Sequence, residues 1–424
     1  MELHNNFLFT NVDAYDCGWQ LKEDDRVIQS GSIAAADLDL PPTGTIGNSK
    51  TIVVPFAVPE TPAPGAEYWL ELRCRLKEDT LWAKTGHVVA SEQFKVELPG
   101  ADFPAIALES LPEFTAVEEE GDIITVTAPD VVVEFDRNRG TLSRYAYRGT
   151  ELLHAGPRPN FWRAPIDNET YLNSGLMPLI TPWYDAAERF RVDDVRLTKA
   201  PKQVTITVDG TIPEPTAAKI AIEYVISSNG DVRVAQTFEP QPGETRIPEV
   251  GMLLQLPAGF ETVEWYGRGP EENYSDRHAG CDVGVYCSTV AEQYFNYSRP
   301  QETGNKTDVR YMAVANQAGV GLMAIAEGAP LEASVLHYTP KDLTNVRHLY
   351  EVAERPETVW RLNRKQTGLG TGLGDSIFQE KHRAHTILPG ATYQYAYLLR
   401  PFDRDMDKMA LSKKRLANDF PADR

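Results

Sequence analysis

Short runs of alternating apolar and polar residues recur along most of the chain, and they constrain its fold more than any other feature. Residues 204–208 and 232–238, for example, alternate with a period of two, which is the pattern of a strand with one buried face. Apolar residues at helical spacing are scarce outside residues 181–190 and 403–418. The sequence therefore predicts an all-β protein, and it has no strand–helix alternation that could build an α/β barrel.

The first hundred residues have the pattern of a separate small β-module. Turn-forming residues such as Glu23-Asp24-Asp25 and the proline-rich stretch 58–65 separate its runs. About seven short strands in about a hundred residues are typical of an immunoglobulin-like or fibronectin-like sandwich. We expect strands at residues 7–10, 18–22, 26–31, 51–56, 68–76 and 93–98.

A boundary follows this module. Breaks at residues 98–104 and an acidic stretch at 118–122 interrupt the strand pattern, which then continues to about residue 402. We expect an immunoglobulin-like domain at 1–100, one large antiparallel sandwich at 101–402 and a peripheral tail at 403–424.

Composition excludes several functional classes. The 424-residue chain has a net charge of −19, which argues against nucleic acid and anionic membranes as partners. No run of about 18 apolar residues could span a bilayer. The first residues lack a signal-peptide pattern, so we expect a cytoplasmic location, with a periplasmic or secreted parent as the alternative.

Cysteine and histidine spacing predicts no metal site. The four cysteines match no zinc or redox motif, and we expect free or buried thiols, with a Cys17–Cys74 bridge as the minor alternative. His382 and His385 are close in sequence, but an offset of three in a strand directs them to opposite faces.

Three polar stretches, at residues 161–169, 266–277 and 297–310, interrupt the strand pattern. They combine arginine, carboxylate, amide and aromatic side chains, which is the set that grips a polyol. The candidate rim residues in them are Arg163, Asp167, Asn168, Glu302, Asn305 and Arg310. The alternative interpretation is structural: Arg163 pairs with Asp167 to fix the loop around Pro165, and the Glu302 group caps the end of a sheet.

The order of these motifs resembles a known family. Phe135-Asp136-Arg137-Asn138-Arg139-Gly140, Phe161-Trp162-Arg163-Ala164-Pro165, Gly267-Arg268-Gly269-Pro270-Glu271-Glu272-Asn273 and Arg299-Pro300-Gln301-Glu302 occur as in the C-terminal domain of large bacterial β-galactosidases of glycoside hydrolase family 2. Residues 82–94 are similar to the sandwich that precedes that domain. The resemblance covers roughly residues 3–402. It implies an immunoglobulin-like β-sandwich followed by a galactose mutarotase-like β-supersandwich.

The resemblance also implies a division of labour. Such enzymes retain configuration and use two glutamates in an α/β barrel, which this chain lacks. We therefore expect no catalytic residue and no activity here, but a region that completes the active-site rim, binds a β-galactoside or galactose at low affinity and supports assembly. The expected partners are the catalytic barrel region or a large subunit, within a homo-oligomer of the full enzyme. No metal or cofactor is expected here, because the Mg and Na of the family belong to the barrel.

A glycine-rich loop near the C-terminus departs from the family pattern. The family places a tryptophan after an Asp-Ser pair, where it stacks on the sugar; here Ile377 follows Asp375-Ser376, and Phe378 comes next. Ile377 offers only dispersion, whereas Phe378 could supply a ring. Asp375, Ile377 and Phe378 are therefore candidate rim residues, with a changed aglycone preference as the hypothesis.

Two other functions stay open. One is an autonomous mutarotase-like domain that binds or isomerises sugar with a glutamate and a histidine. Glu302 is available for this, but the histidine of the related motif, expected before Tyr294, is replaced by Glu292-Gln293. The other is a scaffold that makes no sugar contact.

Overall fold

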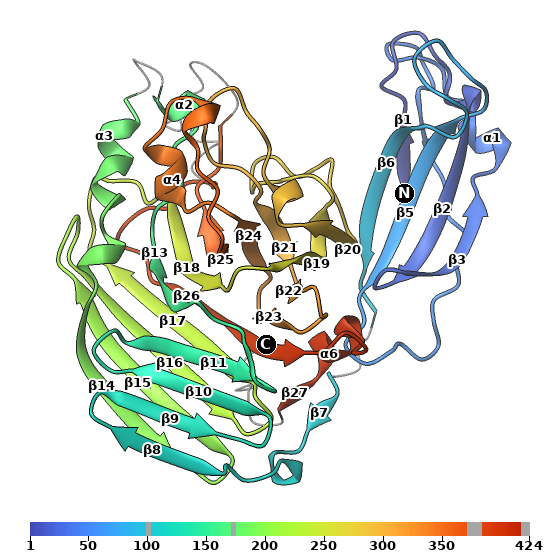
Figure 1. The fold of residues 1–424 in the computed structure, drawn as a ribbon. Coiled ribbons are helices and arrows are strands. Elements are labelled where there is room, and N and C mark those ends of the chain that lie inside the picture. Colours follow the sequence, from blue (N-terminus) through green and yellow to red (C-terminus); the bar gives the residue numbers. More distant parts are fainter. Residues whose placement is uncertain (99–102, 171–174, 371–383, 417–424) are drawn as a thin grey trace. The chain divides into compact units, whose positions relative to one another are not determined.

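The computed structural model describes residues 1–98, 103–170, 175–370 and 384–416 and divides the chain into two compact units (Figure 1). The first comprises Met1–Ala105 with Lys413–Arg415, and the second comprises Ile106–Ser412 with the chain from Leu416 onward. The short strands β7 (Ala105–Ile106) and β27 (Arg415–Leu416) lie where the chain passes from one unit to the other. Within the described residues, no helix is long and apolar enough to cross a membrane.

The first unit contains a four-stranded antiparallel sheet and a two-stranded one. The larger sheet has the order β3-β2-β5-β6: Arg26–Ser32, Tyr15–Glu23, Tyr68–Leu76 and Val88–Val96. The smaller pairs β1 (Glu2–His4) with β4 (Ser49–Thr51), and α1 spans Ala35–Leu38. Trp19 and Leu21 alternate along β2 and enter a core with Leu40, Ile52 and Leu70. The period of two predicted this strand correctly.

Two expected strands of this unit are absent from the structure. Residues 7–10 form a loop, because the Asn5 side chain donates to the carbonyls of Thr10 and Leu40 and accepts from Phe7 N. Ile52 N still donates to the Met1 carbonyl at 2.9 Å, but residues 53–56 leave the ladder as well; Pro55 has no N–H to donate to one.

Cys17 and Cys74 form a disulfide, which corrects the expectation of free thiols at these positions. They are direct partners in the register of β2 and β5, so the bridge crosses two neighbouring strands. A separation of 57 residues in sequence gave no sign of this register. Cys281 is a buried free thiol and Cys287 an exposed one.

The second unit has one nine-stranded sheet and two five-stranded sheets, all antiparallel. The large sheet has the order β14-β15-β16-β17-β26-β23-β22-β19-β20: Arg191–Lys199, Gln203–Ile212, Ala218–Ser227, Val232–Pro240, Tyr393–Phe402, Gly321–Glu327, Tyr311–Asn316, Phe260–Gly269 and Asp282–Thr289. One smaller sheet has the order β12-β11-β10-β9-β8: Thr150–Glu151, Thr141–Tyr147, Val131–Asp136, Ile123–Thr127 and Ala116–Glu120. The other has the order β13-β18-β25-β24-β21: Ala155–Asn160, Glu249–Leu256, Thr358–Gln366, Leu331–Leu336 and Lys306–Val309.

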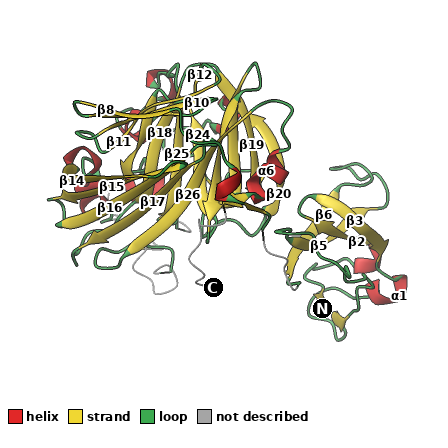
Figure 2. Cartoon of the chain, turned by 90° about the horizontal axis from the view of Figure 1, so that it is seen from below, coloured by secondary structure: helices red, strands yellow, loops and turns green. Residues whose placement is uncertain are grey.

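The two smaller sheets pack on the large one. Figures 1 and 2 both show β8–β11 lying over the β14–β17 part of the large sheet. Phe135 on β10 contacts Tyr224 on β16 with ring centroids 5.3 Å apart. The Tyr397 hydroxyl on β26 lies 3.1 Å from the Met252 sulfur on β18. One apolar core runs between the layers, and the expected all-β supersandwich is confirmed.

Helices in the described residues of the second unit are short. They are α2 (Asp167–Thr170), α3 (Met177–Ile180), α4 (Pro340–Thr344) and α6 (Lys408–Lys413). Single 3₁₀ turns lie at Leu108–Ser110, Thr181–Trp183, Ala187–Arg189, Ala291–Gln293 and Leu349–Glu351. Residues 181–190 are therefore two separate turns and not the helix that their spacing suggested. A helix was expected at 403–418. Among the described residues of that stretch, only α6 (Lys408–Lys413) is helical.

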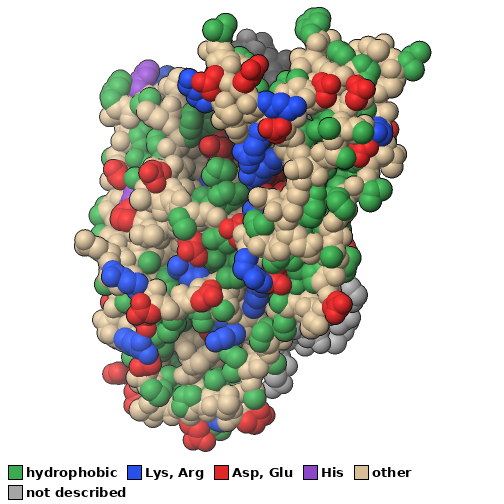
Figure 3. All heavy atoms as spheres, turned by 90° about the vertical axis from the view of Figure 1, so that its right-hand side faces the viewer, with side chains coloured by type: hydrophobic (Ala, Val, Ile, Leu, Met, Phe, Trp, Pro, Cys, Tyr) green, Lys and Arg blue, Asp and Glu red, His purple; other side chains and the backbone are tan. Residues whose placement is uncertain are grey.

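Figure 3 shows one face of the molecule with acidic and basic side chains interspersed. The net charge of −19 is therefore not gathered on this face into a single acidic patch.

Candidate functional site

The loop after β13 is built around a buried ion pair between Arg163 and Glu169. The Arg163 side chain is 0% exposed, and its Nη2 and Nη1 atoms lie 2.8 and 2.9 Å from the two Glu169 oxygens. It also donates to the carbonyl of Thr367 at 3.3 Å. Burial by itself would lower the pKa of Arg163, but the attraction and hydrogen bonds of Glu169 are together larger, so the pKa is raised. The expected internal partner, Asp167, was therefore wrong, because the α2 turn returns Glu169 to the guanidinium.

Asp167 and Asn168 lie on the outer side of this loop. Asp167 is exposed and Asn168 half-buried. The backbone N–H of Asp167 donates to Gln301 Oε1 at 3.2 Å, and Gln301 Nε2 donates to Asp167 Oδ2 at 3.1 Å. This reciprocal contact joins the first polar stretch to the third.

Glu302 belongs to a buried triad with Arg361 and Glu249. Arg361 Nη2 lies 2.6 Å from Glu302 Oε1, and Arg361 Nη1 lies 2.8 Å from Glu249 Oε2. The three side chains are at most 3% exposed. Burial raises the pKa of Glu249 most strongly, the attraction of Arg361 lowers it, and the repulsion from Glu302 raises it. The resulting pKa of Glu249 is about 7. A single guanidinium thus serves two carboxylates.

Asn305 extends the same network, and Arg310 contacts Tyr266 and Asp308. Asn305 is fully buried; it donates to the carbonyl of Asn273 at 2.9 Å and accepts from Gln366 Nε2 at 3.2 Å. Arg310 is half-buried, and its guanidinium lies 5.7 Å from the Tyr266 ring centre. It also donates to the carbonyl of Asp308 at 2.5 Å.

Glu272 holds the loop that carries Glu302. It accepts from Gly304 N at 2.8 Å and from Thr303 Oγ1 at 3.0 Å, and it also contacts Arg277 and the Tyr297 hydroxyl. Burial alone would raise the pKa of Glu272, but these donors lower it overall. The second polar stretch therefore fixes the third.

Two neighbouring residues, Ser275 and Asp276, hold the chain on both sides of residues 371–383. Asp276 accepts from the backbone N–H groups of Leu369 at 3.0 Å and Gly370 at 2.8 Å. On the other side, His385 Nδ1 lies 3.2 Å from Ser275 Oγ. A side chain at Gly368 would begin 2.5 Å from the Asp276 carboxylate, so a larger residue here would displace that carboxylate. The predicted residues Asp375, Ile377 and Phe378 lie outside the described residues.

Sequence reasoning missed Arg361, Glu249 and Gln366, the residues that complete this network. Arg361 and Gln366 lie on β25, where almost every position is buried. Buried charge in an otherwise apolar strand is the available signal, because such a charge requires a partner. The partners of Arg361, however, lie 59 and 112 residues away in sequence.

The network can order loops, but it offers no free acid or base. Arg163 pairs with Glu169, Glu302 with Arg361 on β25, and Asn305 donates to the carbonyl of Asn273. Asp167 is exposed and Asn168 half-buried. Among the described residues, no group of three or more His, Cys, Asp and Glu side chains could hold a metal ion.

Comparisons with known proteins place this architecture in a family. Residues 127–399 match the model of the beta galactosidase small chain, and residues 1–97 match beta-galactosidase domain 4. A β-galactosidase from Priestia megaterium is 34% identical over 401 residues, which are 94% of this chain and 37% of that protein. One from Halalkalibacterium halodurans is 30% identical over 312 residues, covering 72% of this chain and 30% of that protein.

Solved structures give a weaker likeness. A galactose 1-epimerase from Lactobacillus acidophilus is 11% identical with a TM-score of 0.36, covering 69% of this chain and 99% of that one. A putative aldose 1-epimerase from Escherichia coli is 10% identical with a TM-score of 0.37, covering 66% of this chain and 99% of that one.

The chain thus spans about a third of the length of the curated β-galactosidases that it matches. The family model nevertheless covers residues 127–399, which is more than half of the chain. The resemblance read from the motifs is confirmed: the chain belongs to the β-galactosidase small-chain family and carries that family's domain 4 ahead of the small-chain domain.

Proposed function

We propose that this chain is a non-catalytic region of a retaining β-galactosidase that hydrolyses terminal β-D-galactosides. It completes the rim of an active site whose two reactive carboxylic acids lie on another part of the enzyme. Its partner is that catalytic part, on the same polypeptide or on a separate subunit.

The main support for the proposal is that the match covers nearly all of this chain but only a minor part of its relatives. The Priestia megaterium relative covers 94% of this chain, whereas the chain covers 37% of that protein. The relative therefore has a larger portion outside the match, and that portion has room for the catalytic machinery.

The buried carboxylates support the same division. A retaining glycosidase needs two carboxyl groups about 5–5.5 Å apart, facing one glycosidic bond. Glu249 and Glu302 are brought together by Arg361, but their side chains are 0% and 1% exposed. A sugar cannot reach either of them without unpacking the loops.

Within this proposal, the site residues have two kinds of task. Asp167 and Asn168 are exposed enough to contact a sugar hydroxyl at the rim. Arg163, Glu302 and Asn305 act as positioning residues, because each is bonded to another buried group of the chain: Glu169, Arg361 and the Asn273 carbonyl. Ser275 and Asp276 fix the chain that leads to and from the segment with Asp375, Ile377 and Phe378.

The mutarotase-like alternative receives less support. It requires a glutamate that is free to take a proton from a sugar hydroxyl. Glu302 Oε1 accepts from Arg361 Nη2 at 2.6 Å, and Oε2 lies 3.1 Å from Arg361 Nη1. Both oxygens of the proposed base are therefore occupied.

Complementation tests the proposal. The purified chain is assayed with an aryl β-galactoside, first alone and then with the portion of the P. megaterium relative outside the matched region. We expect no turnover by either piece alone and turnover by the mixture. Turnover by the chain alone, or failure of a mixture that demonstrably forms a complex, would contradict it.

A further inference from the structure

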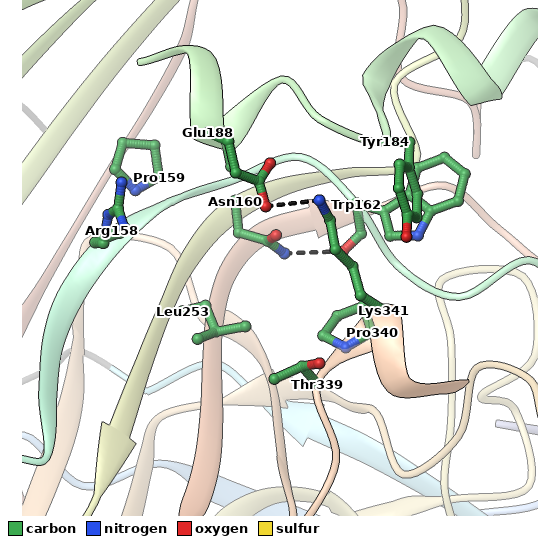
Figure 4. A pocket seen from close by; sticks show the side chains of 11 residues that line it. Arg158, Pro159, Asn160, Trp162, Tyr184, Glu188, Leu253, Thr339, Pro340 and Lys341 are labelled. Carbon is green, nitrogen blue, oxygen red and sulfur yellow. Dashed lines mark hydrogen bonds and ion pairs between the residues drawn. The ribbon is translucent and has the colours of Figure 1, made fainter. Parts of the chain in front are cut away.

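A small pocket opens on the second unit, and its lining residue Asn160 contacts Glu249 of the buried triad. It has a volume of about 200 Å³ and is formed by β13, β18, the turns at 181–190 and the start of α4. Figure 4 shows its side chains converging from these separate segments. Its principal lining residues are Arg158, Asn160, Tyr184, Glu188, Leu253 and Lys341.

One part of the lining is apolar and aromatic. Tyr184 meets Trp162 edge to face, with ring centroids 5.2 Å apart and planes at 85°. The Trp162 indole N–H donates to Thr344 Oγ1 at 3.0 Å, which fixes the ring against α4. Leu253 and Pro340 add aliphatic surface. This surface can pack against the C–H face of a ring.

The charges around the pocket cancel. Lys341 Nζ lies 2.6 Å from Glu188 and 2.8 Å from Asp185, and 4.3 Å from the Tyr184 ring centre. Arg158 is exposed and has no carboxylate partner among the described residues. Glu188 lines the pocket and Asp185 lies just outside the lining, so two carboxylates offset the formal charges of Arg158 and Lys341.

The deepest polar group retains a free acceptor. Asn160 is 7% exposed, and its Nδ2 donates to the carbonyl of Trp162 at 2.9 Å and to Glu249 Oε1 at 2.5 Å. Its Oδ1 receives no hydrogen bond from any described residue, although the side chain lines the pocket. Figure 4 shows this amide directed toward the Lys341 side of the pocket. A ligand hydroxyl can donate there, while Arg158 donates to a ligand oxygen.

We propose that this pocket binds one neutral sugar ring. Such a ring has an apolar face for Tyr184 and Leu253, and hydroxyls that both donate to Asn160 and accept from Arg158. The volume of about 200 Å³ equals roughly seven waters, which suits one ring and not two. The site lies wholly within the second unit, so the proposal goes beyond the role at a shared active site and does not depend on it.

Ligand titration of the full chain tests the proposal. The Trp162 indole N–H signal is followed by nitrogen-edited NMR, with Trp162→Phe to assign it, while D-galactose or D-glucose is added. We expect a saturable shift with a dissociation constant on the order of 1 mM, as for a small neutral ligand. D-glucuronate, which carries a carboxylate, should bind no more tightly.

Variants locate the binding. Arg158→Ala removes an exposed donor and should weaken binding about tenfold, and Leu253→Phe should abolish it by filling the pocket. Arg196→Ala, at an exposed arginine that does not line the pocket, should bind as the unaltered chain does. The absence of a saturable shift, binding that survives both pocket variants, or tighter binding of glucuronate would each overturn the proposal. Complementation of galactosidase activity is a separate readout, so the two proposals can fail independently.

Discussion

Arg361 lies against Glu302 with 2.6 Å between Nη2 and Oε1, although 59 residues separate them in sequence. This contact joins a central strand of the second unit to the loop that the motifs single out. Because Arg361 also holds Glu249, the loop is fixed by a buried charge triad. Substitutions that break this triad should therefore lower the free energy of unfolding.

Arg361→Met should be strongly destabilising. It leaves two buried carboxylates without their cation, and breaking a buried ion pair costs about 3–5 kcal/mol. Urea unfolding followed by near-ultraviolet circular dichroism measures the loss. Arg364→Met, an exposed position on the same strand, is the matched control and should change stability by less than about 0.5 kcal/mol. Equal effects of the two substitutions would contradict the triad.

Glu332→Gln should change how stability depends on pH. Burial raises the pKa of Glu332 from 4.5 to about 8, and its Oε2 accepts from Gln366 N at 2.9 Å. Between these values the folded chain keeps a proton that the unfolded chain has released. The Glu332 contribution to stability therefore falls as pH rises from 4.5 to about 8, by at most about 1.4 kcal/mol per pH unit.

Glutamine cannot release this proton, so the variant should gain stability relative to the unaltered chain across that range. Free energies of unfolding at several pH values between 5 and 8 measure the difference. The exposed substitution Glu239→Gln serves as the control. A difference that stays constant with pH would show that Glu332 titrates normally.

Removal of the Cys17–Cys74 disulfide should weaken the first unit. The bridge closes a loop between residues 57 apart, and loss of such a cross-link costs about 2–4 kcal/mol. Differential scanning calorimetry of Cys17→Ala/Cys74→Ala should show an earlier transition for this unit. A reducing agent should lower the transition of the unaltered chain but not that of the variant. Cys287→Ala, at an exposed free thiol, should leave it unchanged.

Asp276→Ala should loosen the chain before residue 371. The carboxylate accepts from Leu369 N and Gly370 N, so its removal leaves both groups without their acceptor. Hydrogen exchange at these two amides should accelerate by about tenfold. The exposed control Asp405→Ala should not alter it. Unchanged protection in Asp276→Ala would mean that other contacts hold this segment.

The sequence by itself determined the class of fold and the family. Strand Gln203–Ile212 alternates between half-buried and buried at every step, and its apolar residues recur with the same period of two. The motifs identified the family, because several of them follow one another in the same order as in β-galactosidases.

Only the tertiary structure decided which polar groups meet. Arg163 pairs with Glu169 and not with Asp167, because the α2 turn sets which carboxylate returns to the guanidinium. Cys17 meets Cys74, and Arg361 meets Glu249 and Glu302, because strand register brings together residues far apart in sequence. Local patterns specify which face of a strand is buried, but register and layer packing choose the partners across it.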